Sequence, residues 1–202
     1  MKEPRKYIRY IQAFKAHKGI LRFNQAREEN IFPVHLSAMK QAGVIEQLGR
    51  GLYRLTSLPP LSNPDLVTVA AKIPQGVICL ISALSFHNIT TQVPHAVDVA
   101  LKSGSERPTL EHPPTQFYWF SEIPFKNGIE SHEVDGVPVK IYSPEKTIVD
   151  CFKFRNRVGI DVAIEALKLF REKKRFSADT LFKYAKICRM ERVMRPYLET
   201  IL

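Results

Sequence analysis

The sequence predicts an α+β fold in two domains, and three observations lead to this prediction. Residues 1–58 alternate between helical and short extended patterns and end in a glycine-rich hairpin. Three prolines in Leu58–Pro64 then stiffen the chain as a linker. The remainder places short β-branched and aromatic runs before a series of helices, so that strands and helices are segregated along the chain. The 202 residues, 45% of them hydrophobic, suffice for one large domain or two small ones.

The first domain is predicted to follow the order helix, strand, helix, helix, hairpin. Apolar residues at helical spacing indicate a first helix over residues 2–17. A short extended piece occupies residues 20–23, and Asn24 can cap a second helix over residues 25–30. Pro33 opens the third helix, because its missing N–H would have no partner in a first helical turn.

The third helix has two different sides. Leu36 and Met39 lie on one side of the helical wheel, and Gly43 ends the helix. The opposite side is small and polar, and a helix with such a surface suits a groove. This outer side consists of Val34, Ser37, Ala38 and Gln41, with His35 and Lys40 on its flanks.

A tight hairpin follows the third helix. Val44-Ile45 and Leu52–Leu55 are predicted strands, and the glycines of the turn between them can adopt positive φ. Arg50 would lie at the tip. A helix followed by a hairpin with a basic tip is the recognition half of a winged helix-turn-helix, in which the helix enters the major groove of DNA and the wing contacts phosphate or the minor groove.

We therefore predict a set of DNA contacts in this domain. Gln41 can read adenine, and Ala38 can touch a thymine methyl group. Two alternatives remain open: Arg54 can instead pair with Glu46 across the hairpin, and His35 can be an ordinary surface histidine. Winged helices that bind only protein are a further alternative. The predicted contacts are Val34, His35, Ser37, Ala38 and Gln41 for the groove, Arg22, Arg27 and Lys40 for phosphate, and Arg50 with Arg54 for the wing.

The distribution of charge supports a polyanionic partner. The whole chain has a net charge of +10. Residues 1–58 contain 11 basic and 4 acidic residues, a net charge of +7. Residues 59–150 contain 6 basic and 10 acidic residues, a net charge of −4. Residues 151–202 contain 13 basic and 6 acidic residues, a net charge of +7. Two basic blocks indicate two faces that contact phosphate. For the C-terminal block, the alternative is a solvated, charged helix surface.

The second domain is predicted over residues 65–202. Asn63 caps a helix that begins at Pro64. Short strand patterns follow between residues 97 and 142, and Asp135-Gly136 is a strong hairpin signal. We expect a small, mostly antiparallel sheet. Ser143 and Pro144 then start a C-terminal series of helices.

Several classes of protein are disfavoured. The sequence lacks a run of 18 apolar residues and a signal peptide, so we expect a cytoplasmic protein with no membrane span. Its three cysteines, distant from one another and without a CxxC pair, are expected to be free thiols. No P-loop, HExxH, GxSxG or zinc-type Cys/His spacing is present, so we expect neither an enzyme nor a bound cofactor or metal.

Four segments together resemble a known family. They are GRGLYRL, LPPLSNPDLVTVAAKIPQGVICLISALSFHNITTQVP, GVPVKIYSPEKTIVDCFKFRNRVGIDVAIEALK and VMRPYLE. Their order and spacing are similar to those of the AbiEi family, the antitoxins and transcriptional regulators of bacterial type IV toxin–antitoxin (abortive infection, phage defence) systems. The resemblance implies a winged helix-turn-helix domain over residues 1–58, a linker over residues 59–64 and an antitoxin domain over residues 65–202.

The resemblance also implies a function and partners. Members repress their own operon by binding inverted repeats of double-stranded DNA in its promoter, which would require two copies on DNA. The implied functional partner is a nucleotidyltransferase-like toxin, often counteracted without a stable complex. Two alternatives are an enzyme that modifies the toxin covalently and a module that sequesters it directly.

A polar patch in the second domain is the candidate for contact with toxin, nucleotide or DNA. Lys146, Asp150 and Lys153 are three to four residues apart and share one helix face. The alternative is a surface ladder of ion pairs. The full patch is Tyr142, Ser143, Lys146, Asp150, Lys153, Arg155 and Arg157.

Overall fold

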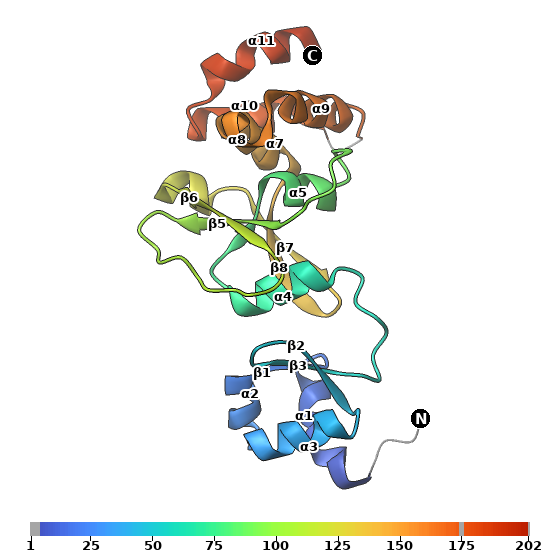
Figure 1. Ribbon diagram of the computed structural model, residues 1–202. Helices are drawn as coiled ribbons and strands as arrows, with labels where there is room; N and C mark the ends of the chain where they lie inside the picture. The colour runs from blue at the N-terminus through green and yellow to red at the C-terminus, as the bar shows by residue number, and fades with distance from the viewer. Residues whose placement is uncertain (1–4, 174–175, 202) are drawn as a thin grey trace. The chain divides into compact units, whose positions relative to one another are not determined.

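The computed structural model describes residues 5–173 and 176–201, without the side chain of Ile201. The chain forms two compact units (Figure 1). The first extends to Pro74 and includes residues Glu133–Pro138, and the second contains the remaining residues from Gln75 onward. The first unit is thus larger than residues 1–58. One reason is that Asp135 accepts hydrogen bonds from the N–H groups of Ser62 and Asn63, at 2.9 and 3.3 Å.

The first unit contains the predicted order of elements. The first helix was predicted from residue 2, but residues 2–4 lie outside the described residues. The elements are η1 (Arg5–Tyr7), α1 (Ile8–Ala16), β1 (Ile20–Arg22), α2 (Phe23–Glu28), α3 (Pro33–Gln41), β2 (Ile45–Gly49), β3 (Leu52–Leu55) and α4 (Pro64–Lys72).

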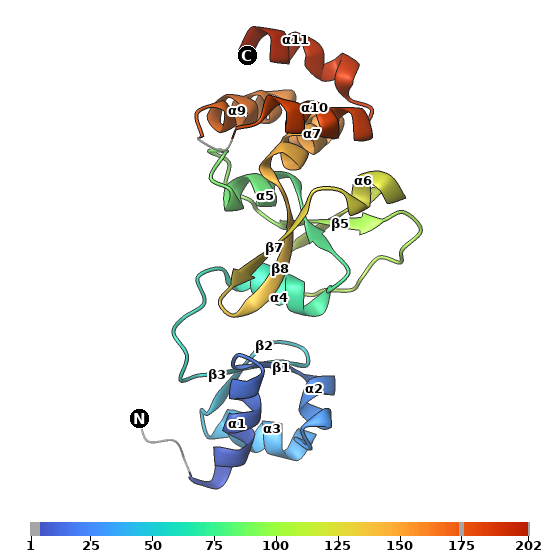
Figure 2. The ribbon, with the colours of Figure 1, turned by 180° about the vertical axis from the view of Figure 1, so that it is seen from behind.

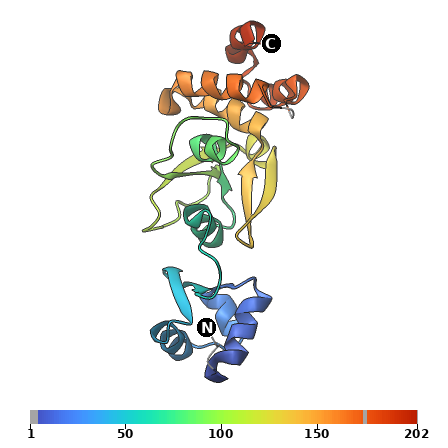
Figure 3. The same ribbon diagram turned by 90° about the vertical axis from the view of Figure 1, so that its right-hand side faces the viewer.

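These elements form a winged helix-turn-helix with α4 added. The strands pair in the antiparallel order β1-β3-β2, and Figure 3 shows helices α1, α2 and α3 beside the small sheet. Its core includes Phe14 of α1, Ala26 of α2 and Met39 of α3. Helix α4 contacts β2 and β3. The α+β class and the N-terminal winged helix-turn-helix are confirmed.

Local signals set most helix boundaries in this unit. Pro33 is the first residue of α3, and Gly43, with φ of +66°, follows its end. Asn63 caps α4 by accepting a hydrogen bond from the Leu66 N–H at 3.3 Å. The cap of α2 was predicted wrongly. Helix α2 starts before Asn24, and the side chain of Gln25 accepts the N–H of Arg22 at 2.9 Å.

The second unit contains a five-stranded sheet and a group of helices. Ser143 and Ser177 cap α7 and α10 through their side chains, as their positions before helical patterns indicate. The elements are β4 (Val77–Ile78), α5 (Leu80–Phe86), β5 (Val97–Lys102), β6 (Thr115–Phe120), α6 (Glu122–Lys126), β7 (Ile129–Val134), β8 (Val137–Tyr142), α7 (Pro144–Lys153), α8 (Arg155–Val158), α9 (Ile160–Arg171), α10 (Ala178–Ile187) and α11 (Glu191–Ile201).

The sheet of the second unit is mixed rather than mostly antiparallel. Its order is β6-β5-β4-β8-β7. Strands β4 and β5 pair antiparallel, whereas β4 with β8 and β5 with β6 pair parallel. The long connection Ser103–Pro114 between β5 and β6 allows the chain to return for parallel pairing. The hairpin turn between β7 and β8 forms at Asp135-Gly136, both with positive φ, as predicted.

The C-terminal helices of this unit gather at one end. Figure 2 shows α7, α9, α10 and α11 together at one end of the second unit. Helix α7 is the central one, since it contacts α5, α9, α10 and α11. The core around it includes Phe152, Leu167 and Leu181. The three cysteines are buried and free, as predicted. Among the described residues, no helix is both long and apolar enough to cross a membrane.

Candidate functional site

The outer side of α3 is an exposed, largely polar helix face. Val34 has 68% of its surface exposed, and Ser37, Lys40 and Gln41 are also exposed. Leu36 and Met39 are buried on the opposite side, at 2% and 0% exposure. The exposure of Val34, Ser37 and Gln41 agrees with the predicted outer side, and this side contains donors and acceptors that can reach base edges.

Two predicted groove residues are partly used by the fold itself. The His35 ring stacks on Tyr10, with centroids 4.8 Å apart, and its Nδ1 accepts the N–H of Phe32 at 3.2 Å. Ala38 is half-buried and packs against the core of this unit. The fold thus gives both residues a packing role that helical spacing alone does not reveal.

The wing is short and has a basic tip. Arg50 is exposed at the turn between β2 and β3, and Gly51 has φ of +68°. Lys40 of α3 donates a hydrogen bond to the Gln47 side chain of β2 at 2.9 Å, which joins the helix to the wing. Nothing in the sequence pattern marked Gln47. Gly49 lies beside Thr68 of α4, so part of the wing packs on α4.

The prediction that Arg54 contacts DNA is corrected, because the structure gives this residue a structural role. It is only 5% exposed, and its Nη1 lies 2.7 Å from Oε1 of Glu46, the alternative that the sequence left open. Its Nη2 donates to the Pro59 carbonyl. A guanidinium held in this way cannot reach a phosphate without leaving its place in the fold.

The remaining predicted phosphate contacts differ from each other. Arg27 is exposed on α2. Arg22 is half-buried, and its Nη2 lies 3.5 Å from the Ala70 carbonyl of α4. The structure therefore leaves Arg27, Lys40 and Arg50 accessible to an anion in the first unit, while it directs Arg22 towards α4.

The polar patch predicted for the surface of the second unit also needs correction, because its central residues are buried inside the protein. Lys146 and Asp150 on α7 are both 0% exposed, and Lys146 Nζ lies 2.5 Å from Asp150 Oδ2. Neither an exposed patch nor a surface ladder describes this buried pair. The ammonium group of Lys146 also lies 4.1 Å from the ring centroid of Tyr142 and 4.9 Å from that of Phe120.

Burial shapes the chemistry around this pair. Removal from water raises the pKa of Asp150, and Lys146 opposes that change. The Cys188 thiol lies 3.7 Å from Asp150 Oδ1, and burial raises the pKa of Cys188 to about 11. Tyr142 donates its hydroxyl to the Phe125 carbonyl at 2.8 Å, and Ser143 caps α7. Tyr142 and Ser143 are thus structural as well.

The other members of the patch lie nearer the surface. Arg157 is exposed and lies 4.4 Å from the ring centroid of Tyr118, and Arg155 donates to the Phe152 carbonyl at 3.0 Å. Lys153 lines a hollow of about 790 Å³ between α6 and the end of α10. Two further cations, Lys186 and Arg189, line the same hollow. The net charge of the C-terminal block indicated cations in general, but only the fold shows which of them gather.

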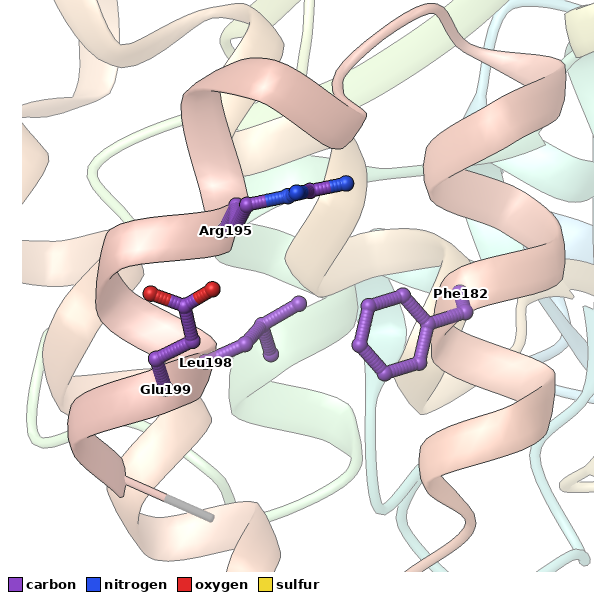
Figure 4. A pocket seen from close by; sticks show the side chains of 4 residues that line it. All are labelled: Phe182, Arg195, Leu198 and Glu199. Carbon is purple, nitrogen blue, oxygen red and sulfur yellow. The ribbon is translucent and has the colours of Figure 1, made fainter.

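A second, smaller hollow lies between α10 and α11. It has a volume of about 320 Å³ and is lined by Phe182, Arg195, Leu198 and Glu199. In Figure 4 the Phe182 ring and the Leu198 side chain face each other across the hollow, and Arg195 reaches over it towards α10. Phe182 is 44% exposed, which makes this an apolar surface with charged edges.

Comparisons with known proteins agree with this fold. A crystal structure of the Rv2827c protein from Mycobacterium tuberculosis aligns with a TM-score of 0.60 and 11% identity, over 92% of this chain and 72% of that one. This likeness concerns the fold alone. No curated protein sequence matches the chain. Residues 9–56 match the family model described as "Transcriptional regulator, AbiEi antitoxin". The winged helix-turn-helix part of this chain is therefore similar to the AbiEi antitoxin family of transcriptional regulators over these 48 residues.

Proposed function

We propose that this protein is a DNA-binding antitoxin that represses its own toxin–antitoxin operon by binding inverted repeats in the promoter. The observation that carries the proposal is the exposed, polar outer side of α3 beside an exposed arginine at the wing tip. In this arrangement α3 lies in the major groove, where Gln41 and Ser37 meet base edges. Arg27, Lys40 and Arg50 contact phosphates and set the register of the helix on the duplex.

Two copies bind one operator in this proposal. A single helix of nine residues reads only a few base pairs, which is too little information to select one promoter. Two copies on an inverted repeat double the length of sequence that is read, and the symmetry of the site then mirrors that of the protein pair. The spacing of the half-sites is therefore a geometric property that footprinting can measure.

The test measures fluorescence anisotropy of the full chain with its own promoter and with a scrambled duplex at physiological salt. We expect promoter DNA to bind more tightly, and Gln41→Ala to lose about 1–3 kcal/mol of binding free energy on the promoter alone. Gln92→Ala, which changes an exposed glutamine of the second unit, is the matched control. Equal affinity of the unaltered protein for both duplexes would show that repression is not its function.

The second unit is proposed to counteract a nucleotidyltransferase-like toxin, as the resemblance of the first unit to the AbiEi family implies. The basic hollow lined by Lys153, Lys186 and Arg189 supports this proposal, because its three cations outnumber its single carboxylate, Glu122, and can attract an acidic or phosphorylated group. Lys186→Glu should abolish rescue of cells that express the toxin. Lys183→Glu makes the same change on the same helix at a residue that does not line the hollow, and it should leave rescue intact.

Direct sequestration of the toxin is the second candidate, and the hollow between α10 and α11 favours it, because the apolar Phe182 ring is exposed there. Co-elution of the two proteins on gel filtration would support sequestration, and separate elution would exclude a stable complex. We propose no catalytic role for the second unit, since the buried Lys146–Asp150 pair is shielded from a macromolecular substrate. A covalent modification found on the co-expressed toxin by mass spectrometry would overturn that part.

A further inference from the structure

Three potential metal ligands meet at one edge of the five-stranded sheet. They are His87, which follows the last residue of α5, and Glu130 and His132 of β7. One ligand atom from each lies within 4.8 Å of the other two. The two segments are 43 residues apart in the sequence, so this cluster is a product of the fold. It takes no part in the proposed DNA interface.

The strand β7 and its neighbours hold these side chains together. Glu130 and His132 are two residues apart on a strand, so their side chains point to the same face. Nε2 of His132 lies 3.0 Å from Oε2 of Glu130. The rings of His87 and His132 have centroids 5.8 Å apart, and the Phe86 ring packs against both. The aromatic contact limits the ways in which the two imidazoles can turn.

The hydrogen bond of His87 determines which of its nitrogens is available. Nε2 of His87 lies 2.8 Å from the carbonyl oxygen of Tyr142. A carbonyl oxygen can only accept, so Nε2 bears the hydrogen and Nδ1 of the neutral ring presents a lone pair. Metal-ligating histidines usually donate their second N–H in this manner to a backbone carbonyl or a carboxylate, which fixes the tautomer and the ring.

We propose that His87, Glu130 and His132 bind one divalent transition-metal ion, with Zn²⁺ as the best match. Two imidazoles and one carboxylate form a typical zinc ligand set with a fourth position open to water or another ligand. Zinc bonds of about 2.0–2.1 Å in a tetrahedron place neighbouring ligand atoms about 3.3 Å apart. The histidine–carboxylate separation of 3.0 Å is close to that value. Mg²⁺ and Ca²⁺ prefer several oxygen ligands, and this cluster offers a single carboxylate.

The remaining separation requires a small movement. Atoms up to 4.8 Å apart must approach by about 1.5 Å to reach tetrahedral distances. His132 is half-buried and Glu130 is exposed, and both lie on β7, the edge strand of the sheet. Rotation of their side chains can therefore bring the ligand atoms to these distances. Binding would join α5 to the edge strand β7 and thereby stiffen this part of the second unit.

The test titrates ZnCl₂ into tag-free, chelator-treated full-length protein against a chromophoric zinc chelator. We expect one ion per chain, and at least a tenfold weaker affinity in His87→Ala, His132→Ala and Glu130→Gln. His95→Ala changes an exposed histidine outside the cluster and is the matched control, with unchanged affinity. MgCl₂ in excess should not displace the zinc. Circular dichroism of each variant confirms that it is folded before its affinity is compared.

A second measurement does not depend on the variants. Co²⁺ substituted for Zn²⁺ should give the intense visible absorption of a tetrahedral site with nitrogen and oxygen ligands, without the charge-transfer band of thiolate ligation. Absence of saturable binding to the full chain would overturn the proposal. So would equal zinc affinity in all variants, or a thiolate band, because each would assign the ion to other residues such as the buried cysteines.

Discussion

Helices α3 and α7 contain polar residues at similar helical spacing, yet the fold uses them in opposite ways. On α3 the polar side, with Ser37 and Gln41, faces solvent and is available to DNA. On α7 the pair Lys146 and Asp150 is fully buried. The spacing of polar residues therefore identifies a helix face, but the neighbouring elements decide whether that face meets water. An exposed polar face is free to bind a partner, whereas a buried pair is committed to the stability of the fold.

The largest expected effect follows from breaking the buried pair of α7. Lys146→Met leaves the Asp150 carboxylate buried without its cation, and we expect a loss of about 3–5 kcal/mol in the free energy of unfolding. Replacing both residues, Lys146→Met with Asp150→Leu, should recover most of that loss because no unpaired charge remains. On α3, Lys40→Met should change stability by less than about 0.5 kcal/mol. Urea unfolding measures all three. A loss in Lys146→Met as small as that in Lys40→Met would contradict the structural role of the pair.

The two helices also show what the sequence could and could not reveal. Pro33, Gly43 and Ser143 act on the backbone beside them, so the ends of α3 and the start of α7 were predictable from local chemistry. The burial of Lys146 was not, because it depends on Phe120 and Tyr142, which come from different strands. The parallel pairing within the second sheet was missed for the same reason, since register depends on distant segments.

The candidate sites also differ in whether their residues are close together in the sequence. The outer side of α3 is one continuous stretch of sequence, and helical spacing was sufficient to find it. The basic hollow at Lys153 and Lys186 and the histidine cluster at His87 and His132 combine residues from separate elements. A motif search that requires fixed spacing cannot detect ligands that only the topology of the sheet brings together.

Asp98 is another buried acid of the second unit, and the cation that acts on it is Arg157 rather than a lysine. Burial raises the pKa of Asp98 from 3.8 to about 6, although the Ser82 N–H and Arg157 oppose the shift. The folded state then binds a proton more tightly than the unfolded chain. The contribution of Asp98 to stability is thus highest below pH 4 and falls as the pH rises towards 6.

The corresponding variant is Asp98→Asn, which removes the titration and keeps an acceptor for Ser82. Its stability relative to the unaltered protein should rise by about 2 kcal/mol between pH 4 and pH 7. Thermal and urea unfolding at several pH values measure this difference. A stability difference that stays constant with pH would show that folding leaves the pKa of Asp98 unchanged.

Arg54 and Arg50 repeat the comparison within the wing. Arg54 is buried against Glu46, and Arg50 is exposed at the tip. Arg54→Met removes charged hydrogen bonds and should cost about 1.5–3 kcal/mol of stability in the first unit. Arg50→Met makes the same chemical change and should leave the free energy of unfolding unaltered within about 0.5 kcal/mol. Similar losses in the two variants would mean that the wing tip is also part of the fold.

The smallest effect concerns DNA binding by Arg50. An arginine that contacts one phosphate releases about one counterion, so Arg50→Ala should reduce the slope of log K against log salt by about 0.9 per bound copy. Affinity should fall by a similar factor on the promoter and on a scrambled duplex, because a phosphate contact contains no sequence information. Gln41→Ala should have the opposite pattern: the salt slope should be unchanged, and the loss of affinity should be confined to the promoter. Anisotropy titrations over a range of salt concentrations separate these patterns. A loss in Arg50→Ala that is restricted to the promoter would instead place the wing tip against bases in the minor groove.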